Sequence, residues 1–162
     1  MKNNKMPTPD QLNIEITDNM RKKMGAFVTL HKNGMLRGCI GEIIPRRPLY
    51  KAVMNQAVNS GLNDYRFPQV KESEIPKIEF EISALTPPTS ISSYKDIVLG
   101  RDGIIISKHG RSAVYLPQVA PEQGWGLDET LSHLSLKAGL PADAWKDDAS
   151  FTTFRAIVFN EE

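Results

Sequence analysis

The stretch Leu36-Arg37-Gly38-Cys39-Ile40-Gly41 contains the only cysteine of the chain. Gly38 directly precedes this thiol, and Gly41 follows it by two residues. Glycine leaves room for another backbone or a ligand to approach closely. A nearby arginine favours the thiolate, the form of cysteine that reacts or binds metal. We therefore expect the hexapeptide to mark a site, with Cys39 at its centre and Arg37 beside it.

A β-hairpin is predicted around the hexapeptide. The pair Asn33-Gly34 separates two apolar segments, residues 26–31 and residues 35–43. An Asn-Gly pair in this position is a strong signal for a two-residue hairpin turn. With such a turn, position 31 pairs with 36, position 30 with 37, and position 28 with 39.

This register decides what surrounds the thiol. Side chains alternate along a strand, so Arg37 and Cys39 are expected on one face with Val28 and Leu30. His31 is then expected on the opposite face, which makes Arg37 the nearest charge able to lower the pKa of the thiol. A bulged three-residue loop would exchange the two faces.

The remaining segments predict an α+β fold. They comprise a helix opening at Pro48, an alternating strand over 77–85, a second hairpin from 103–107 to 112–116, a helix capped by Asp128, and a strand over 151–159. Hairpins combined with a few helices indicate mixed or antiparallel sheets in an α+β arrangement. The two hairpins, each preceding a helix, hint at an internal repeat.

Length and composition predict one ordinary globular domain. The chain has 162 residues and a formal net charge of +1, which gives no support to a nucleic-acid or membrane partner. Residues 1–13 are polar and contain two prolines, so we expect a disordered arm there and a single domain over 14–162. No segment predicts a signal peptide or a membrane span, and a lone cysteine fits a reducing compartment, so a cytoplasmic location is expected.

The sequence leaves the role of Cys39 open. It could be a nucleophile, a redox-sensitive thiol or a metal ligand, or a small buried hydrophobe, since free cysteine is among the most buried residue types. A metal site is the weakest of these, because one cysteine and three scattered histidines offer no zinc-type spacing. We therefore expect neither a metal nor a cofactor.

Three further residues are candidates for a site. Asp64 and Arg66 lie in a loop after the Pro48 helix, where they could bind a ligand or simply pair with each other. Glu81 lies on a strand face with Glu79, as paired catalytic carboxylates would, although a solvated strand face is the commoner explanation.

The chain resembles the AMMECR-type domain, the family of AmmeMemoRadiSam system protein A. The hexapeptide at 36–41 carries the resemblance, supported by Arg66-Phe67-Pro68, Leu116-Pro117-Gln118-Val119-Ala120, Gly124-Trp125 and Lys137-Ala138-Gly139-Leu140-Pro141. The resemblance implies a compact α+β domain of two subdomains that form a cleft, with the signature residues gathered near it. Ser135 stands where the family often has a second cysteine, so an intrachain dithiol cycle is not expected.

Two functions follow as hypotheses. The first is an accessory or binding domain of a modification pathway, with a cleft centred on the hexapeptide and with Gly38, Gly41, Asp64 and Arg66 contacting the ligand. The resemblance suggests a Memo-like protein and a radical S-adenosylmethionine protein as partners, whereas a nucleotide or RNA has no support from the net charge. The second is an enzyme or covalent carrier in which Cys39 is the nucleophile, Arg37 lowers its pKa, and Glu81 or Asp64 handles a proton.

Overall fold

The computed structural model describes residues 6–161 and divides the chain into two compact units. The first unit runs to Leu85 and resumes at Ile157, and the second comprises Thr86–Ala156. Each unit contains a four-stranded sheet with helices, so the predicted α+β class is confirmed. Over residues 6–161 no helix is both long enough and apolar enough to cross a membrane. The cleft stays a prediction.

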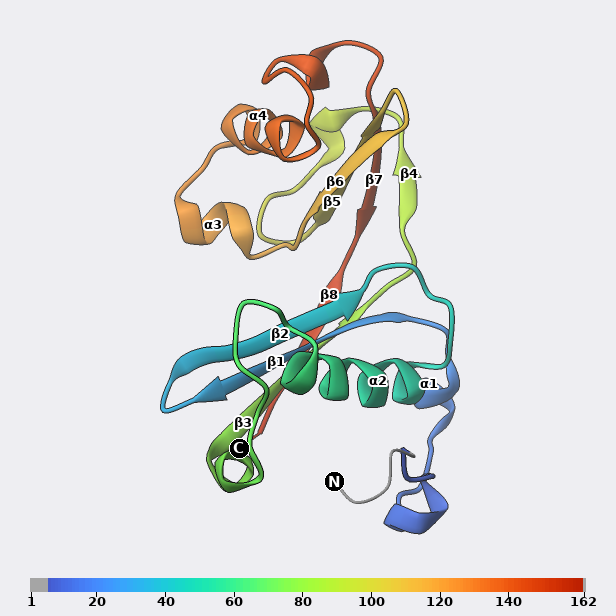
Figure 1. The fold of residues 1–162 in the computed structure, drawn as a ribbon. Helices are drawn as coiled ribbons and strands as arrows, with labels where there is room; N and C mark the ends of the chain where they lie inside the picture. The colour runs from blue at the N-terminus through green and yellow to red at the C-terminus, as the bar shows by residue number, and fades with distance from the viewer. Residues whose placement is uncertain (1–5, 162) are drawn as a thin grey trace. The chain divides into compact units, whose positions relative to one another are not determined.

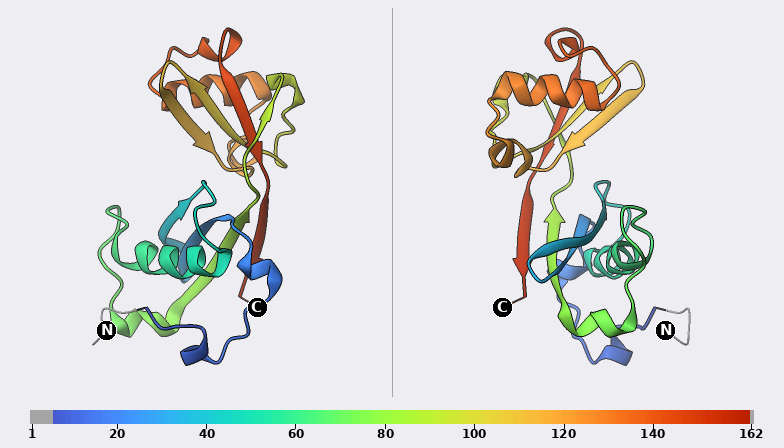
Figure 2. Two further views of the ribbon diagram at one scale, coloured as in Figure 1. Left: turned by 90° about the vertical axis from the view of Figure 1, so that its right-hand side faces the viewer. Right: turned by 60° about the vertical axis from the view of Figure 1, so that its left-hand side comes forward.

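The first unit is built on the predicted hairpin. Strands β1 (Gly25–Lys32) and β2 (Met35–Glu42) are joined by Asn33-Gly34, both at positive φ. Strands β3 (Ile78–Leu85) and β8 (Ala156–Asn160) complete the sheet in the order β2-β1-β3-β8. Strand β2 therefore lies at one edge, and α2 (Leu49–Leu62) lies across one face of the sheet (Figures 1 and 2).

Small side chains hold α2 close to the sheet. The apolar contacts join Val28, Leu30 and Ile78 of the sheet to Val53 and Ala57 of α2. The most buried positions of the helix are instead Ala52, Gln56 and Ser60, a face that the apolar spacing alone does not show. Because these side chains are small or polar, the helix axis can approach the strands closely enough for side-chain hydrogen bonds to the sheet backbone.

Ser60 inserts its hydroxyl between the two strands of the hairpin. The Oγ accepts a hydrogen bond from the Ile40 N–H at 2.8 Å and donates one to the Val28 carbonyl at 2.6 Å. The hydroxyl thereby satisfies one donor and one acceptor of the sheet backbone, which would be costly to leave unpaired in the interior.

The register of the hairpin differs from the prediction beyond its first pairs. His31 pairs with Leu36 as expected, but Leu30 pairs with Gly38 and Thr29 with Cys39, because Arg37 is an extra residue at a β-bulge. The predicted pairings 30–37 and 28–39 are therefore wrong by one residue. The bulge, rather than a longer turn, shifts every later residue of β2 to the other face.

Short elements complete the first unit. They are η1 (Asp10–Leu12), α1 (Asp18–Arg21) and η2 (Glu72–Lys77), the last leading directly into β3. Of the predicted disordered arm, residues 1–5 lie outside the described residues, and residues 6–13 include the η1 turn.

The second unit places helices on a sheet ordered β4-β7-β5-β6. Its strands are β4 (Thr89–Ile91), β5 (Gly103–Lys108), β6 (Arg111–Tyr115) and β7 (Ser150–Phe154). Its helices are η3 (Tyr94–Asp96), α3 (Val119–Gln123), α4 (Leu127–Lys137) and η4 (Ala144–Lys146). Leu131 and Leu134 of α4 pack on Ile104, Ile106 and Phe151.

Two predicted boundaries in this region need correction. The N-cap of α4 is Gly126, and Asp128 lies in the first turn, where its charge favours the helix dipole. The single strand predicted over 151–159 is two strands, since Arg155 separates β7 from β8 and the two belong to different sheets.

The connectivity supports the suspected internal repeat. In the first unit the β1–β2 hairpin precedes α2, and the following strand β3 pairs with β1. In the second unit the β5–β6 hairpin precedes α3 and α4, and the following strand β7 pairs with β5. The fourth strand of each sheet comes from the crossing of the chain between the units. Strand β4, which follows β3, joins the second sheet, and β8, which follows β7, joins the first.

The Ser60 bridge generates a test with a matched control. Ser60→Ala should lower the free energy of unfolding by about 1–3 kcal/mol, because the Ile40 N–H and the Val28 carbonyl lose their partner. Ser135→Ala should change it by less than about 0.5 kcal/mol, because this equally buried hydroxyl bonds only the Leu131 carbonyl of its own helix. Urea denaturation measures both, and equal losses would contradict the role given to Ser60.

Candidate functional site

The backbone of Cys39 is held from outside the sheet by two side chains. Because β2 is an edge strand, the N–H and carbonyl of Cys39 have no strand partner on their outer side. Asp64 Oδ2 accepts from the Cys39 N–H at 2.9 Å, and Arg66 Nη2 donates to the Cys39 carbonyl at 3.0 Å. The loop after α2 thus replaces a neighbouring strand at this point of the edge.

Asp64 and Arg66 also form an ion pair with each other. Arg66 Nη2 lies 2.7 Å from Asp64 Oδ2 and its Nε 2.9 Å from Oδ1. Only 3% of the Asp64 side chain is exposed, against 46% of the Arg66 side chain. The hydrogen bonds from Arg66, aided by the Cys39 N–H, hold the pKa of Asp64 well below its ordinary value despite burial, and Asp64 raises the pKa of Arg66.

Other parts of the protein fill the space where a side chain would lie at both glycines of the hexapeptide. A Cβ on Gly38 would lie 2.1 Å from the carbonyl oxygen of Ser60, and one on Gly41 would lie 2.2 Å from the ring of Phe27. The close approach that the sequence predicts at these positions is therefore made by α2 and by a cross-strand aromatic ring. Contact of either glycine with a ligand stays a prediction.

Arg37 does not lie beside the thiol. Its guanidinium donates to both carboxylate oxygens of Glu74 at 3.1 Å, and Lys32 donates to the same carboxylate at 2.7 Å. The hydrogen bonds from Arg37 and then Lys32 hold the pKa of Glu74 well below its ordinary value. The expectation that Arg37 activates Cys39 is wrong, because the bulge at Arg37 separates the faces on which the two side chains lie.

The thiol lies on the sheet face opposite α2. Its Sγ accepts a hydrogen bond from Thr29 Oγ1 at 3.3 Å, and Thr29 pairs across the sheet with both Cys39 and Glu81. His31 is two residues from Thr29 along β1, so it shares this face, contrary to the prediction. We call Thr29, His31, Cys39 and Glu81, all partly exposed, the thiol face.

In the part of the chain that the structure describes, no carboxylate or imidazole is hydrogen-bonded to the thiol. Among residues 6–161, Thr29 is the hydrogen-bond partner found for Cys39 Sγ. In the same part of the chain no three His, Cys, Asp or Glu side chains lie close enough together to hold a metal ion. Asp64, a predicted proton carrier, is instead an ionised acceptor for the Cys39 N–H and Arg66.

Three residues of this region escaped the sequence analysis. Ser60 and Thr29 carry no motif, and only the tertiary packing of α2 and the register bring them to the hexapeptide. Glu74 has a weak signal, since a glutamate three residues after Lys71 is the spacing of a capping box, and its carboxylate does accept from the Lys71 N–H.

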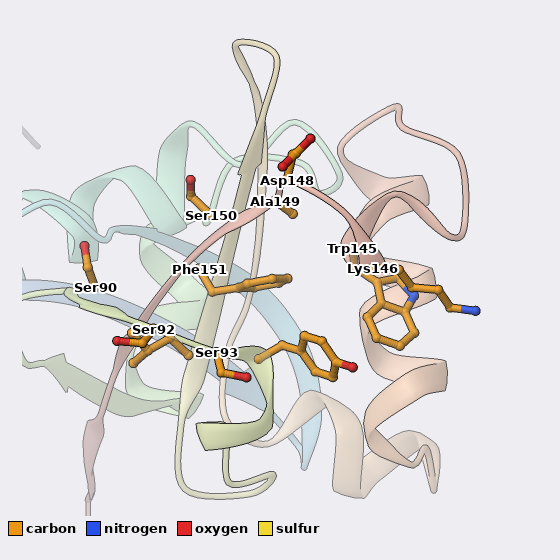
Figure 3. A pocket seen from close by; sticks show the side chains of 11 residues that line it. Ser90, Ser92, Ser93, Trp145, Lys146, Asp148, Ala149, Ser150 and Phe151 are labelled. Atoms are coloured by element: carbon orange, nitrogen blue, oxygen red, sulfur yellow. The ribbon is translucent and has the colours of Figure 1, made fainter.

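The second unit holds a separate polar pocket of about 460 Å³ beside β4. Serine side chains from β4, the loop after it and β7 line this pocket, together with Trp145 and Phe151 of the core (Figure 3). The serines offer hydrogen bonds, but Lys146 extends away from them and lies against the Trp145 ring. Asp148 also lines the pocket, but among the described residues it makes no hydrogen bond to a serine, so the pocket is a weaker candidate than the thiol face.

Comparison with known proteins decides the family. The AMMECR1 family model matches residues 1–159. The chain belongs to the AMMECR1 family. The uncharacterized protein PH0010 from Pyrococcus horikoshii has a crystal structure that matches with a TM-score of 0.80 at 40% identity, covering 92% of this chain and 81% of that one.

Two curated relatives cover most of the chain at similar identity. Protein Mbar_A1807 of Methanosarcina barkeri is 39% identical over 98% of this chain and 81% of its own length. Protein PF1979 of Pyrococcus furiosus is 42% identical over 91% of this chain and 76% of its own length. These names state no activity, so membership of the AMMECR1 family assigns the fold without assigning a reaction.

The crowding at Gly38 predicts a large effect of a single methyl group. Gly38→Ala should destabilise the protein by about 1–3 kcal/mol or more, because the new Cβ meets backbone that cannot move without shifting α2. Gly61→Ala, in α2, is the control: its Cβ would find ordinary contacts at 3.7 Å, and alanine favours the helix. Thermal and urea unfolding compare the two variants, and equal stabilities would refute this account.

The bonds of the buried Asp64 carboxylate to Arg66 and the Cys39 N–H should contribute to the free energy of unfolding in a pH-dependent way. Asp64→Asn should cost about 1–3 kcal/mol at pH 7, because Arg66 and the Cys39 N–H lose a charged acceptor. The folded-state pKa lies below the unfolded one, so the contribution is complete above about pH 5 and declines as the pH falls through about 4. The difference from wild type should therefore shrink at pH 3. Asp147→Asn, an exposed aspartate, should show no such trend.

Proposed function

We propose that this AMMECR1 domain is an accessory or binding module, and that it recognises its partner through the thiol face rather than performing chemistry with Cys39. The observation that carries the proposal is that Asp64 and Arg66 bond the N–H and the carbonyl of Cys39, while the thiol has Thr29 as its hydrogen-bond partner. The thiol bonds a neutral hydroxyl, and the neighbouring cation, Arg66, is already paired with Asp64. Such a preorganised strand suits recognition better than nucleophilic attack, which needs an adjacent base or a cation free to stabilise the thiolate.

The thiol face offers what a recognition surface needs. Thr29, His31 and Glu81 supply hydrogen-bond donors and acceptors, and Cys39 adds a small soft group among them. These side chains project from adjacent strands β1, β2 and β3. Because strands hold these side chains, their geometry varies little. The surface would therefore lose little conformational entropy when a partner binds.

The partners belong to the proposal as well. The family resemblance suggests a Memo-like protein and a radical S-adenosylmethionine protein as components of one modification pathway. In this view the domain positions one of these proteins or its substrate, and the residues of the thiol face make the contact.

The alternative function is an enzyme or covalent carrier that uses Cys39. One observation favours it: Glu81 and His31 lie on the same sheet face as the thiol, so a bound substrate could bridge them to Cys39. Arg37 and Asp64 no longer contribute to this alternative, because Glu74 and Arg66 respectively engage their charges.

Binding to the suggested partners separates the two functions. Glu81→Arg should weaken binding to the Memo-like or radical S-adenosylmethionine protein at least about tenfold, since a reversed charge at a contact surface costs several kcal/mol. Cys39→Ser should leave it within about threefold. Glu129→Arg, on the exposed part of α4, is the control and should bind as wild type. Calorimetry measures the affinities, and failure of wild type to bind either protein would refute the assigned partners.

Alkylation tests the thiol directly, because the chain has one cysteine. For a binding module the rate of reaction with iodoacetamide should keep rising above pH 8. A plateau below about pH 7 would reveal a stabilised thiolate and favour the enzyme. Loss of pathway activity in Cys39→Ser with unchanged partner affinity would point the same way.

A further inference from the structure

The first unit contains a second candidate site, which includes no residue of the hexapeptide. An apolar cavity of about 350 Å³ lies between the N-terminal segment and α2. Leu12 and Ile14 form one wall, Val53 and Met54 of α2 form another, and Ile82 contributes from the sheet. The lining is almost wholly apolar, so the cavity suits a hydrocarbon group and offers nothing to a polar one.

This space opens to solvent and is large enough to hold a ligand. Interiors are close-packed, and an engineered apolar cavity of roughly 150 Å³ already holds one benzene. A cavity of about 350 Å³ therefore has room for a chain of about ten carbons. Leu12 and Ile14 are also 46% and 48% exposed, so an occupant would cover apolar surface that now meets water.

Basic residues directly follow two of the residues that line the cavity. Arg21 directly follows Met20, a lining residue, and Lys51 places its ammonium 5.8 Å from the ring centre of Tyr50, another lining residue. The backbone of Lys22 and Lys23 is tied to the start of α2, where Leu49 donates to the Lys22 carbonyl at 2.9 Å and Lys23 bridges to Pro48.

These charges exceed what the neighbouring acids neutralise. Within residues 9–23 and 46–51 there are six basic side chains and three acids, Asp10, Glu15 and Asp18. Of the six, Arg47 pairs with a carboxylate, that of Glu42 at 3.1 Å, and the described residues show no such pair for the other five. The whole chain has a net charge of only +1, so these two segments concentrate positive charge.

We infer that this cavity binds a single-chain amphiphile with an anionic head, a fatty carboxylate or an alkyl phosphate. The hydrocarbon chain fills the space between the N-terminal segment and α2, and the head lies among Arg21, Lys23 and Lys51. The site shares no residue with the thiol face, so it is independent of the proposed function.

Matched ten-carbon ligands test the chemistry. Decanoate and decyl phosphate, below their micelle concentrations, should bind one to one in calorimetry, and the comparison of the two shows which anionic head is preferred. Decyltrimethylammonium, with the same chain and the opposite charge, should bind at least about tenfold more weakly. Affinity for the anions should fall with added salt, because exposed charges are screened.

Variants locate the site. Ile14→Trp should fill the cavity and weaken decanoate binding at least about tenfold, whereas Ile75→Trp, an equally exposed isoleucine in a different groove, should not. The double variant Lys23→Glu/Lys51→Glu should weaken decanoate at least about tenfold and leave decanol unchanged. Lys77→Glu/Lys95→Glu is its charge-matched control. Circular dichroism confirms that each variant is folded.

Three results would overturn the inference. They are no saturable binding of decanoate or decyl phosphate to the wild-type chain, equal affinity for the cationic ligand, and binding to vesicles of anionic phospholipid without binding of the monomeric ligands. The last result would mean that these basic residues meet a membrane surface and that the cavity takes no ligand. Unchanged binding in Ile14→Trp would place any ligand elsewhere.

Discussion

The exposed edge of β2 is the constraint on which the candidate site depends. At Cys39 the strand has an N–H and a carbonyl with no strand beside them, and Asp64 and Arg66 satisfy both. For these side chains to reach the edge, α2 must end next to β2. That approach requires glycine at position 38, where the Ser60 carbonyl leaves no room for a Cβ. The hexapeptide is thus tied to α2 by backbone contacts.

One extra residue in β2 decides what the thiol can do. The bulge directs Arg37 to Glu74 and places Cys39 beside Thr29 on the opposite face. An arginine two residues from a cysteine is a reasonable signal for an activated thiol. Here, however, the two side chains lie on different faces of one strand. The arrangement gives the protein a rigid strand whose thiol bonds Thr29, while Arg66, the cation beside Cys39, is paired with Asp64 and bonds the Cys39 carbonyl. This is why recognition is the function we favour.

Several elements were predictable because their signals are local. The Asn33-Gly34 turn, the alternation of β3 and the second hairpin follow from turn chemistry and side-chain periodicity. The division of the last strand at Arg155 was not predictable, because both halves have strand composition and only their pairing with different sheets separates them. The burial of Ser60 in α2 was equally hidden, since apolar periodicity indicates the larger residues and the closest contact is made by a small one.

By itself the sequence determined the family and the α+β class and indicated the candidate site, because the hexapeptide, the turn residues and the periodicity are properties of short segments. Only the tertiary structure decided the neighbours of Cys39. Glu74, Ser60 and Asp64 are each at least twenty residues from their partners in the hexapeptide. A bulge costs one residue and leaves little trace in composition, yet it exchanges the faces of a strand. The pairing of Arg37 with Glu74 instead of Cys39 is therefore a result of packing, which no local pattern specifies.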